Sequence, residues 1–272
     1  MEGMNRALSA LFKVLENYDK QCPNCSAQLV RPKTLSRVTG KKMAGACMSC
    51  GYKEPPTEPQ NNKALTDLEM SQIARKNDAT NYLYKYSMPS DMYSFKNRFT
   101  NYQANTQEQK DALEFAKKAA ENIAAREPTH VLMYGQTGVG KTHLTMGIIW
   151  DVLERTKYAL NVVFVDWREL LDERKRGISD REVKHRTEDV IKQIKRADLV
   201  IIDDLGSERV NEYSADTLDE IWRARENKAT IVNTNLAGSV LKENYGDRVM
   251  SRFGKNGMSY AFKNIQDYRA KK

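Results

Sequence analysis

Residues 135–144 read GQTGVGKTHL and carry the residue types that hold a phosphate group. Glycines in such a loop let the backbone wrap around an anion without a Cβ clash, so that successive N–H groups and the start of the next helix point at it. The lysine would reach the β- and γ-phosphates, and the threonine would hold Mg²⁺. The pattern G-x-x-x-x-G-K-[ST] is met at every fixed position, and the predicted nucleotide-binding residues are Gly135, Gln136, Thr137, Gly138, Val139, Gly140, Lys141, Thr142 and His143.

Two aspartates end the apolar run LVIIDD. A buried central strand of a parallel sheet would present such carboxylates at its C-terminal end. Asp203 is the candidate for binding Mg²⁺ through water, and Asp204 is the candidate for polarising the attacking water. A strand can also end in acids because its turn is solvated. The phosphate loop favours the catalytic interpretation, since it needs a metal partner.

Two asparagines follow the apolar run ATIV at the end of another predicted strand. An amide in this position can orient water and report whether the third phosphate is present. Asparagine is also common at strand ends because it favours turns. We place Asn235 in the site, and the sequence leaves open whether Asn233 takes the role instead.

The four cysteines form two C-x-x-C pairs, Cys22-Pro-Asn-Cys25 and Cys47-Met-Ser-Cys50, with 21 residues between them. Four thiolates on two tight turns suit a tetrahedral Zn²⁺ ion, and Gly51 gives the second turn backbone freedom. Four free thiols or a redox pair are the alternatives. A site closed by four cysteines has no open position for chemistry, so the predicted zinc site is structural.

Apolar strands alternate with helices from residue 130 onwards, which predicts an α/β fold with a parallel sheet covered on both faces. Thr106 and Gln109 have the spacing of a capping box for the helix that leads into this core. Apolar residues at helical spacing predict a short amphipathic helix over residues 4–18. The predicted domains are a zinc module at 1–53, a linker and helical connector at 54–100, and the nucleotide-binding domain at 101–272.

Composition sets the class of protein. Hydrophobic residues make up 40% of the chain and charged residues 29%, which excludes collagen-like and disordered chains. We find no membrane span and no secretory signal, and the paired cysteines fit a reducing compartment, so we expect a cytoplasmic protein. The net charge of +8 favours a polyanionic partner.

Basic residues gather between positions 167 and 196, among them Arg174, Lys175 and Arg176. They could line a channel for single-stranded nucleic acid, in which Trp167 or Tyr213 could stack on bases. Such rings are more often part of a core or an interface. Acidic residues are interleaved with them throughout. An exposed helix pair laced with ion pairs is therefore the alternative.

Five segments together resemble the AAA+ ATPases that load bacterial replicative helicases, the DnaC and DnaI type. The segments are THVLMYGQTGVGKTHL, ADLVIIDDLGSE, TIVNTNL, YGDRVMSRFGKNG and DYR, and the resemblance spans about residues 90–272. It implies an AAA+ core that assembles with copies of itself into composite ATP sites. It also implies that Arg252, or else Arg248, touches the γ-phosphate of a neighbouring subunit, and that Arg269 closes on the nucleotide of its own subunit.

The resemblance implies an ATP-dependent factor that loads a hexameric replicative DNA helicase onto single-stranded DNA, gripping the helicase through its N-terminal part. ATP, Mg²⁺ and Zn²⁺ are the expected cofactors. Asp204 stands where many AAA+ motors have glutamate, so we expect slow hydrolysis with ATP as a switch. The alternatives are an ATPase helper of a transposase, or a zinc-containing nucleic-acid-binding module that does not hydrolyse ATP. An initiator is less expected, because 20 residues follow Arg252.

Overall fold

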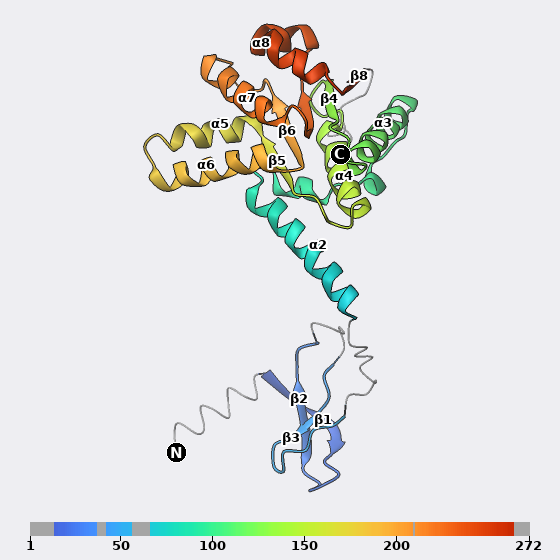
Figure 1. Ribbon diagram of the computed structural model, residues 1–272. Coiled ribbons are helices and arrows are strands. Elements are labelled where there is room, and N and C mark those ends of the chain that lie inside the picture. Colours follow the sequence, from blue (N-terminus) through green and yellow to red (C-terminus); the bar gives the residue numbers. More distant parts are fainter. Residues whose placement is uncertain (1–13, 37–41, 56–65, 209, 264–272) are drawn as a thin grey trace. The chain divides into compact units, whose positions relative to one another are not determined.

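The computed structural model describes residues 14–36, 42–55, 66–208 and 210–263 (Figure 1). The chain divides into two compact units, Met1–Thr66 and Asp67–Lys272. The second unit therefore includes part of the segment 54–100 that the sequence assigned to a connector. No helix in the described part of the chain has both the length and the apolar character that a membrane crossing needs.

The first unit is a small antiparallel sheet with the strand order β1-β2-β3. Its strands are β1 (Leu15–Gln21), β2 (Gln28–Pro32) and β3 (Ala46–Cys47). Its buried core consists of Cys22, Leu29 and Cys47, which is very little apolar surface for an independent fold. The helix predicted over residues 4–18 is wrong from Leu15 onwards, because Leu15 pairs with Pro32 across the sheet. Residues 4–13 of that helix lie outside the described residues.

The second unit is built on a parallel sheet with the strand order β5-β6-β7-β4-β8. This confirms the predicted α/β class. The strands are β4 (His130–Gly135), β5 (Val162–Asp166), β6 (Leu199–Leu205), β7 (Ala229–Thr234) and β8 (Gly257–Phe262).

Helices cover both faces of this sheet (Figure 1). Side chains alternate along each strand, so that on β4 Val131 and Met133 join one core and Leu132 joins the other. The first core contains helices α3 (Gln107–Ala124) and α4 (Lys141–Arg155). The second contains helices α5 (Trp167–Arg176), α6 (Arg181–Arg196), α7 (Glu212–Arg225) and α8 (Gly238–Gly254). The capping box at the start of α3 is confirmed, because the N–H of Gln109 donates to Thr106 Oγ1 and the N–H of Thr106 donates to Gln109 Oε1.

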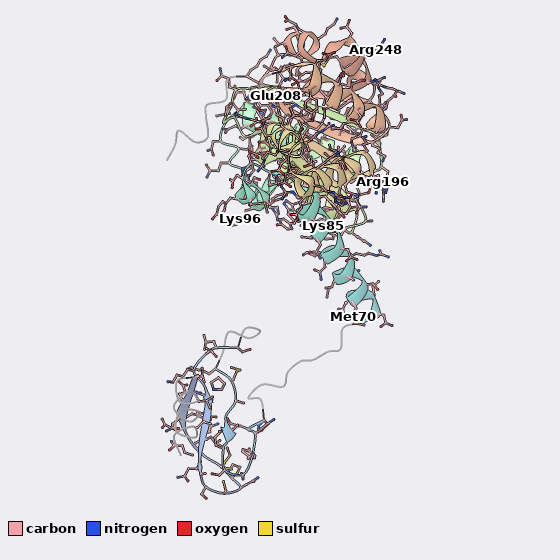
Figure 2. All side chains as sticks on the ribbon, turned by 90° about the vertical axis from the view of Figure 1, so that its left-hand side faces the viewer. Met70, Lys85, Lys96, Arg196, Glu208 and Arg248 are labelled. Atoms are coloured by element: carbon pink, nitrogen blue, oxygen red, sulfur yellow. The ribbon has the colours of Figure 1, made fainter. Side chains whose placement is uncertain are left out.

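Helix α2 (Asp67–Tyr86) precedes the sheet and packs on it only through its C-terminal half, where Ala79 and Leu83 are buried. Met88 then pairs with the edge strand β5, its N–H donating to the Phe164 carbonyl at 2.8 Å. Two short 3₁₀ helices follow, η1 (Met92–Lys96) and η2 (Phe99–Asn101). Figure 2 shows Lys85 beside the core and Met70, which is 49% exposed, at the far end of α2.

Arg225 is fully buried at the end of α7 and stabilises the chain where strands β6 and β7 begin, at the opposite ends of the strands from the phosphate loop. Its Nη1 donates to the carbonyls of Ile194 at 2.6 Å and Ala197 at 2.9 Å, and its Nη2 donates to the Ala229 carbonyl at 2.5 Å. Burial lowers the pKa of this guanidinium to about 9.

We expect the substitution Arg225→Ala to lower the free energy of unfolding by about 3 kcal/mol, because it leaves buried carbonyls without donors and opens a cavity. Urea denaturation followed by circular dichroism would measure the change. The matched control is Arg223→Ala, whose side chain is exposed and should barely move the midpoint. Equal midpoints for both variants would contradict this role for Arg225.

Candidate functional site

The loop between β4 and α4 has the backbone of a phosphate cradle. Gly135 and Gly140 both have positive φ angles, 155° and 98°. A Cβ on Gly135 would lie 2.7 Å from the Cβ of Phe262, so no larger residue fits there. Gly140 is the N-cap of α4 and leaves the N–H groups of the first turn without a side-chain cap. These donors and the helix dipole together suit an anion.

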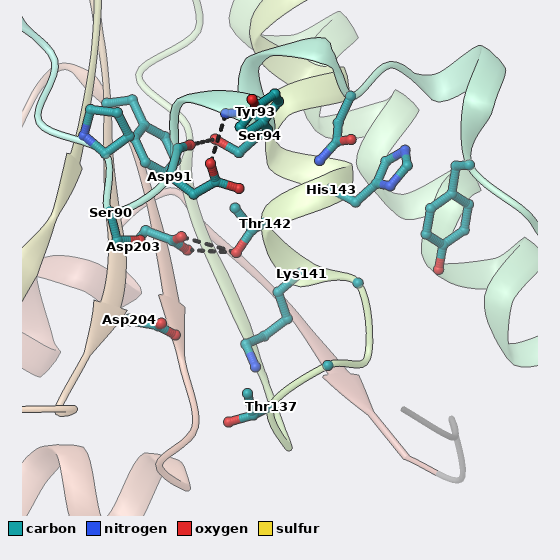
Figure 3. A pocket seen from close by; sticks show the side chains of 16 residues that line it. Ser90, Asp91, Tyr93, Ser94, Thr137, Lys141, Thr142, His143, Asp203 and Asp204 are labelled. Carbon is teal, nitrogen blue, oxygen red and sulfur yellow. Dashed lines mark hydrogen bonds between the residues drawn. The ribbon is translucent and has the colours of Figure 1, made fainter. Parts of the chain in front are cut away.

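The Thr142 hydroxyl and the Asp203 carboxylate face each other at the start of α4 and the end of β6 (Figure 3). Thr142 Oγ1 donates to Asp203 Oδ2 at 2.9 Å. Asn233 Nδ2 donates to Asp203 Oδ1 at 2.6 Å and to Thr145 Oγ1 at 2.9 Å. The pair predicted to hold Mg²⁺ is thus brought together, and a buried amide fixes the carboxylate.

Asp203 and Asp204 lie at a bulge in β6. The pairing with β7 shifts between Ile202 and Leu205, so that two aspartates stand opposite the single residue Asn233. Asp204 adopts a left-handed backbone with φ of 52°, and Figure 3 shows its carboxylate in the pocket. Burial raises the pKa of Asp203 to about 7, and the carboxylate of Asp204 adds to this shift while the Asn233 amide opposes it. A bound cation would favour the charged form of Asp203.

Lys141 is 5% exposed and links the loop to β7. Its Nζ donates to the carbonyls of Gly135 at 2.7 Å and Gln136 at 2.9 Å, and to Asn235 Oδ1 at 2.8 Å. The two asparagines that the sequence left unresolved therefore have different surroundings. Asn233 is buried against Asp203, and Asn235 reaches the lysine.

A cavity of about 360 Å³ extends from Thr137, Gly138 and Lys141 to a wall formed by residues 89–97. Figure 3 shows Thr142 between Asp91 on this wall and Lys141 on the loop. Sequence reasoning missed this wall. The available signal was Pro89 followed by Asp91, which caps η1 through a hydrogen bond from the Tyr93 N–H at 2.9 Å.

Two of the predicted nucleotide-binding residues, Val139 and His143, pack their side chains against other parts of the second unit. Val139 is buried in the core, which leaves only its backbone for a ligand. His143 borders the cavity, and its Nε2 lies 2.8 Å from Asn101 Oδ1 and 3.1 Å from the Arg98 carbonyl. Burial lowers the pKa of His143, which favours the neutral ring.

The predicted arginines are carried by α8, which bends at Gly246 where φ is 83°. Arg252 Nη1 donates to Asp219 Oδ1 at 2.7 Å, and Asp219 also pairs with Arg223. Arg248 is exposed and makes no ion pair within the described residues, and Figure 2 shows it on the outside of the second unit. Neither arginine of α8 lines the cavity of its own chain. Arg269 lies outside the described residues.

The four cysteines meet in the first unit, with their sulfurs all within 4.8 Å of one another. The Sγ atoms of Cys22 and Cys50 are 3.5 Å apart, and those of Cys25 and Cys47 are 3.4 Å apart. Tetrahedral zinc with bonds near 2.3 Å places its sulfurs about 3.8 Å apart, so the cluster fits this metal.

Two matching turns present these thiols. The N–H of Ser26 donates to the Cys22 carbonyl at 2.9 Å, and the N–H of Gly51 donates to the Cys47 carbonyl at 3.1 Å. Ser26 and Gly51 occupy equivalent places and both have positive φ angles, 57° and 77°. A hydrogen bond from the Cys50 N–H lowers the pKa of the Cys47 thiol to about 6, whereas the neighbouring thiols raise the pKa of Cys50 to about 12.

The basic stretch on α5 and α6 is mostly paired with its own acids. Asp172 lies between Arg168 and Lys175, and Glu173 pairs with Arg176 and Arg186. Trp167 is fully buried, so of its two interpretations the structure confirms packing in the core and excludes base stacking. Tyr213 is 39% exposed, and the Arg174 guanidinium lies 5.2 Å from the centre of its ring.

The second unit is similar in sequence to known proteins. The family profile of the bacterial DnaA ATPase domain matches residues 91–261. The chromosomal replication initiator protein DnaA of Ruegeria sp. (strain TM1040) is 27% identical over 146 residues, which cover 51% of this chain and 29% of that protein. The DnaA of Caulobacter sp. (strain K31) is 31% identical over 122 residues, which cover 44% of this chain and 23% of that protein. The chain thus spans less than a third of the length of either relative.

Solved structures share the fold. The crystal structure of the DnaC helicase loader superposes with a TM-score of 0.55 at 23% identity, covering 64% of this chain and 100% of that one. That of DnaI gives 0.52 at 20% identity, covering 65% and 94%. The initiator DnaA bound to AMPPCP and single-stranded DNA gives 0.50 at 20% identity, covering 61% and 49%. The AAA+ fold predicted from the resemblance to helicase loaders is confirmed.

Proposed function

We propose a function for this chain, which belongs to the family of bacterial DnaA ATPase domains. It is an ATP-controlled factor of replication initiation that loads a hexameric helicase onto single-stranded DNA. The carrying observation is the convergence of Lys141, Thr142, Asp203 and Asn235 on the loop after β4. Likeness in fold to the DnaC helicase loader and to DnaI supports the loading role.

Each residue of the pocket has a role in holding ATP. The N–H groups at the start of α4 would cradle the phosphates. Lys141 now donates to neutral carbonyls, and a charged phosphate oxygen is the stronger acceptor, so its ammonium would exchange these partners for the β- and γ-phosphates. Thr142 and Asp203 would hold Mg²⁺, which neutralises charge on the phosphates. Asn235, which already contacts Lys141, would sense the γ-phosphate.

Asp204 is the candidate for polarising the attacking water. Its carboxylate enters the pocket from the bulge of β6, one methylene shorter than a glutamate in the same place. A water held less closely by the base reacts more slowly. Slow turnover suits a switch, in which bound ATP favours one assembly state and hydrolysis releases it.

The neighbouring subunit would complete the site with an arginine. Arg252 is our choice, and its ion pair with Asp219 would hold it ready until a γ-phosphate replaces the carboxylate. Arg248 is the second candidate because it is exposed. Arg269 remains a prediction for the arginine that closes the site within one subunit.

The other partners would bind outside this pocket. The zinc unit is proposed to grip the helicase. Tyr213 and Arg174 are proposed to meet single-stranded DNA, since the exposed ring can stack on a base and the guanidinium can pair with a phosphate.

Size-exclusion chromatography with light scattering tests the proposal. Added ATP should shift the chain to an oligomer, and the cognate helicase should join it. Arg252→Ala should lower turnover by about 100-fold while leaving ATP affinity within about twofold, because it removes a contact made across the subunit boundary. Glu243→Gln, an exposed change on the same helix, is the control.

Two results would count against the loader. The first is an absence of any ATP-dependent complex with the helicase. The second concerns catalysis: turnover by the wild type that never exceeds that of Asp204→Asn, with or without single-stranded DNA, would favour a module that binds ATP without hydrolysing it.

A further inference from the structure

Glu208 connects three separate parts of the second unit. Its Oε1 accepts a hydrogen bond from Trp167 Nε1 at 2.8 Å and another from the Tyr245 hydroxyl. Its Oε2 accepts one from the Gly206 N–H at 2.9 Å. The donors belong to the first residue of α5, the turn after β6, and α8. One carboxylate therefore ties the aspartate strand to the helix that carries the arginines.

These contacts specify a positioning role. Trp167 is 0% and Tyr245 6% exposed, so both donors are buried and would be costly to leave unpaired. Glu208 makes no ion pair within the described residues, and its three hydrogen-bond donors there are uncharged. Both of its oxygens accept hydrogen bonds from within the chain, which fixes the orientation of the carboxylate. It also lies outside the residues that line the nucleotide cavity.

The connection runs from the catalytic bulge to the bend in α8. Asp204 and Gly206 both have left-handed backbones, with φ of 52° and 87°, so the turn that carries Glu208 is set by the position of the bulge. Tyr245 immediately precedes Gly246, where α8 bends. Because Arg248 and Arg252 follow the bend, a shift of Tyr245 would redirect both guanidinium groups.

We propose that Glu208 is a positioning residue that couples the nucleotide pocket of one subunit to the arginine this subunit offers to its neighbour. The inference rests on the proposed function, since it requires composite sites between subunits. A change at Asp204, when the γ-phosphate is present or absent, moves the Gly206 turn, and Glu208 transmits the movement through Tyr245 to α8. Each site in the assembly thereby controls the next one.

The first test compares Glu208→Gln and Tyr245→Phe with the control Glu243→Gln. Glu208→Gln should lower turnover by about tenfold while nucleotide affinity, measured with a fluorescent ATP analogue, stays within about twofold. Tyr245→Phe removes only the hydroxyl and should lower turnover in the same direction. The double variant should be no worse than Glu208→Gln, because the two groups form one connection. Thermal unfolding would check that all variants are folded.

Mixing two kinds of subunit distinguishes an effect of Glu208 on the neighbouring subunit's nucleotide site from an effect on the site of its own subunit. A Lys141→Ala subunit has no working pocket and keeps its arginines, whereas a Glu208→Gln subunit keeps its pocket and misplaces its arginines. Alone, the Lys141→Ala subunit is nearly inactive, and the Glu208→Gln subunit keeps about a tenth of the wild-type turnover. In an equimolar mixture, about a quarter of the head-to-tail interfaces pair an intact pocket with intact arginines, so turnover should recover.

A second mixture serves as the positive control for this experiment. Subunits with Arg248→Ala and Arg252→Ala together, mixed with Lys141→Ala, should recover turnover if composite sites exist at all. Recovery in the reference without recovery for Glu208→Gln or Tyr245→Phe would overturn the inference and leave the proposed function intact. No recovery in the reference would remove the composite site, and the inference would fall with it.

Discussion

Replacing Lys141 with alanine is expected to lower the affinity for Mg·ATP by at least about 100-fold and turnover by about 1,000-fold. The ammonium lies at the centre of the loop, within 2.9 Å of two carbonyls and of the Asn235 amide oxygen. Two charge-assisted hydrogen bonds to phosphate oxygens are worth about 3–4 kcal/mol together, and each 1.4 kcal/mol is a factor of ten in affinity. Isothermal titration calorimetry would measure the affinity, and phosphate release the turnover.

Lys117→Ala is the matched control, because Lys117 is an exposed lysine on α3 and makes no ion pair within the described residues. It should leave both quantities unchanged. Lys141→Arg should restore little, since the larger planar group does not fit a side chain that is 5% exposed. Undiminished ATP binding by Lys141→Ala would mean that the nucleotide does not occupy this loop.

The local part of the site could be predicted from the sequence. The phosphate loop is contiguous, so its spacing alone defines Gly135, Lys141 and Thr142. Asp203 could be placed because an apolar run of four residues predicts a central strand and parallel strands end at one edge. The structure bears this out, with Thr142 and Asp203 in hydrogen-bonding distance although 61 residues separate them.

The long-range part could not be predicted, because it depends on register. A bulge sets Asn233 opposite both aspartates, and a shift of one residue would have turned its amide to the other face. The same holds for Glu208, whose partners Trp167 and Tyr245 come 41 residues before it and 37 after it. Neither partner forms a recognisable motif with it.

Local patterns in the sequence were also insufficient where tertiary contacts decide the conformation or the environment of a residue. Leu8, Leu11, Phe12 and Leu15 have helical spacing, and pairing with β2 determines the conformation from Leu15 onwards. For Trp167, at the start of a basic segment, the sequence leaves base stacking and core packing open. Its indole is fully buried and donates a hydrogen bond to Glu208. Tertiary contacts override local propensity in both cases.

Removal of zinc is expected to unfold the first unit while the second unit keeps its fold. Among the apolar residues that the structure describes in the first unit, Cys22, Leu29 and Cys47 are buried, and two of these three are predicted ligands. So small a core cannot offset the entropy of ordering the three strands, and metal binding would supply the missing free energy. The second unit has two large cores of its own and contains the whole phosphate loop.

A strong chelator should make the region of residues 14–55 at least about tenfold more sensitive to protease, while a fragment containing residues 67–263 persists and still binds ATP. Cys47→Ser should act like the chelator, because its thiol is buried and bonded within the cluster. Ser49→Ala, in the same turn but outside the ligand set, should retain one zinc ion per chain by mass spectrometry. Resistance of the first unit to protease after complete loss of zinc would exclude a structural metal site, because the strands would then hold together through their own contacts.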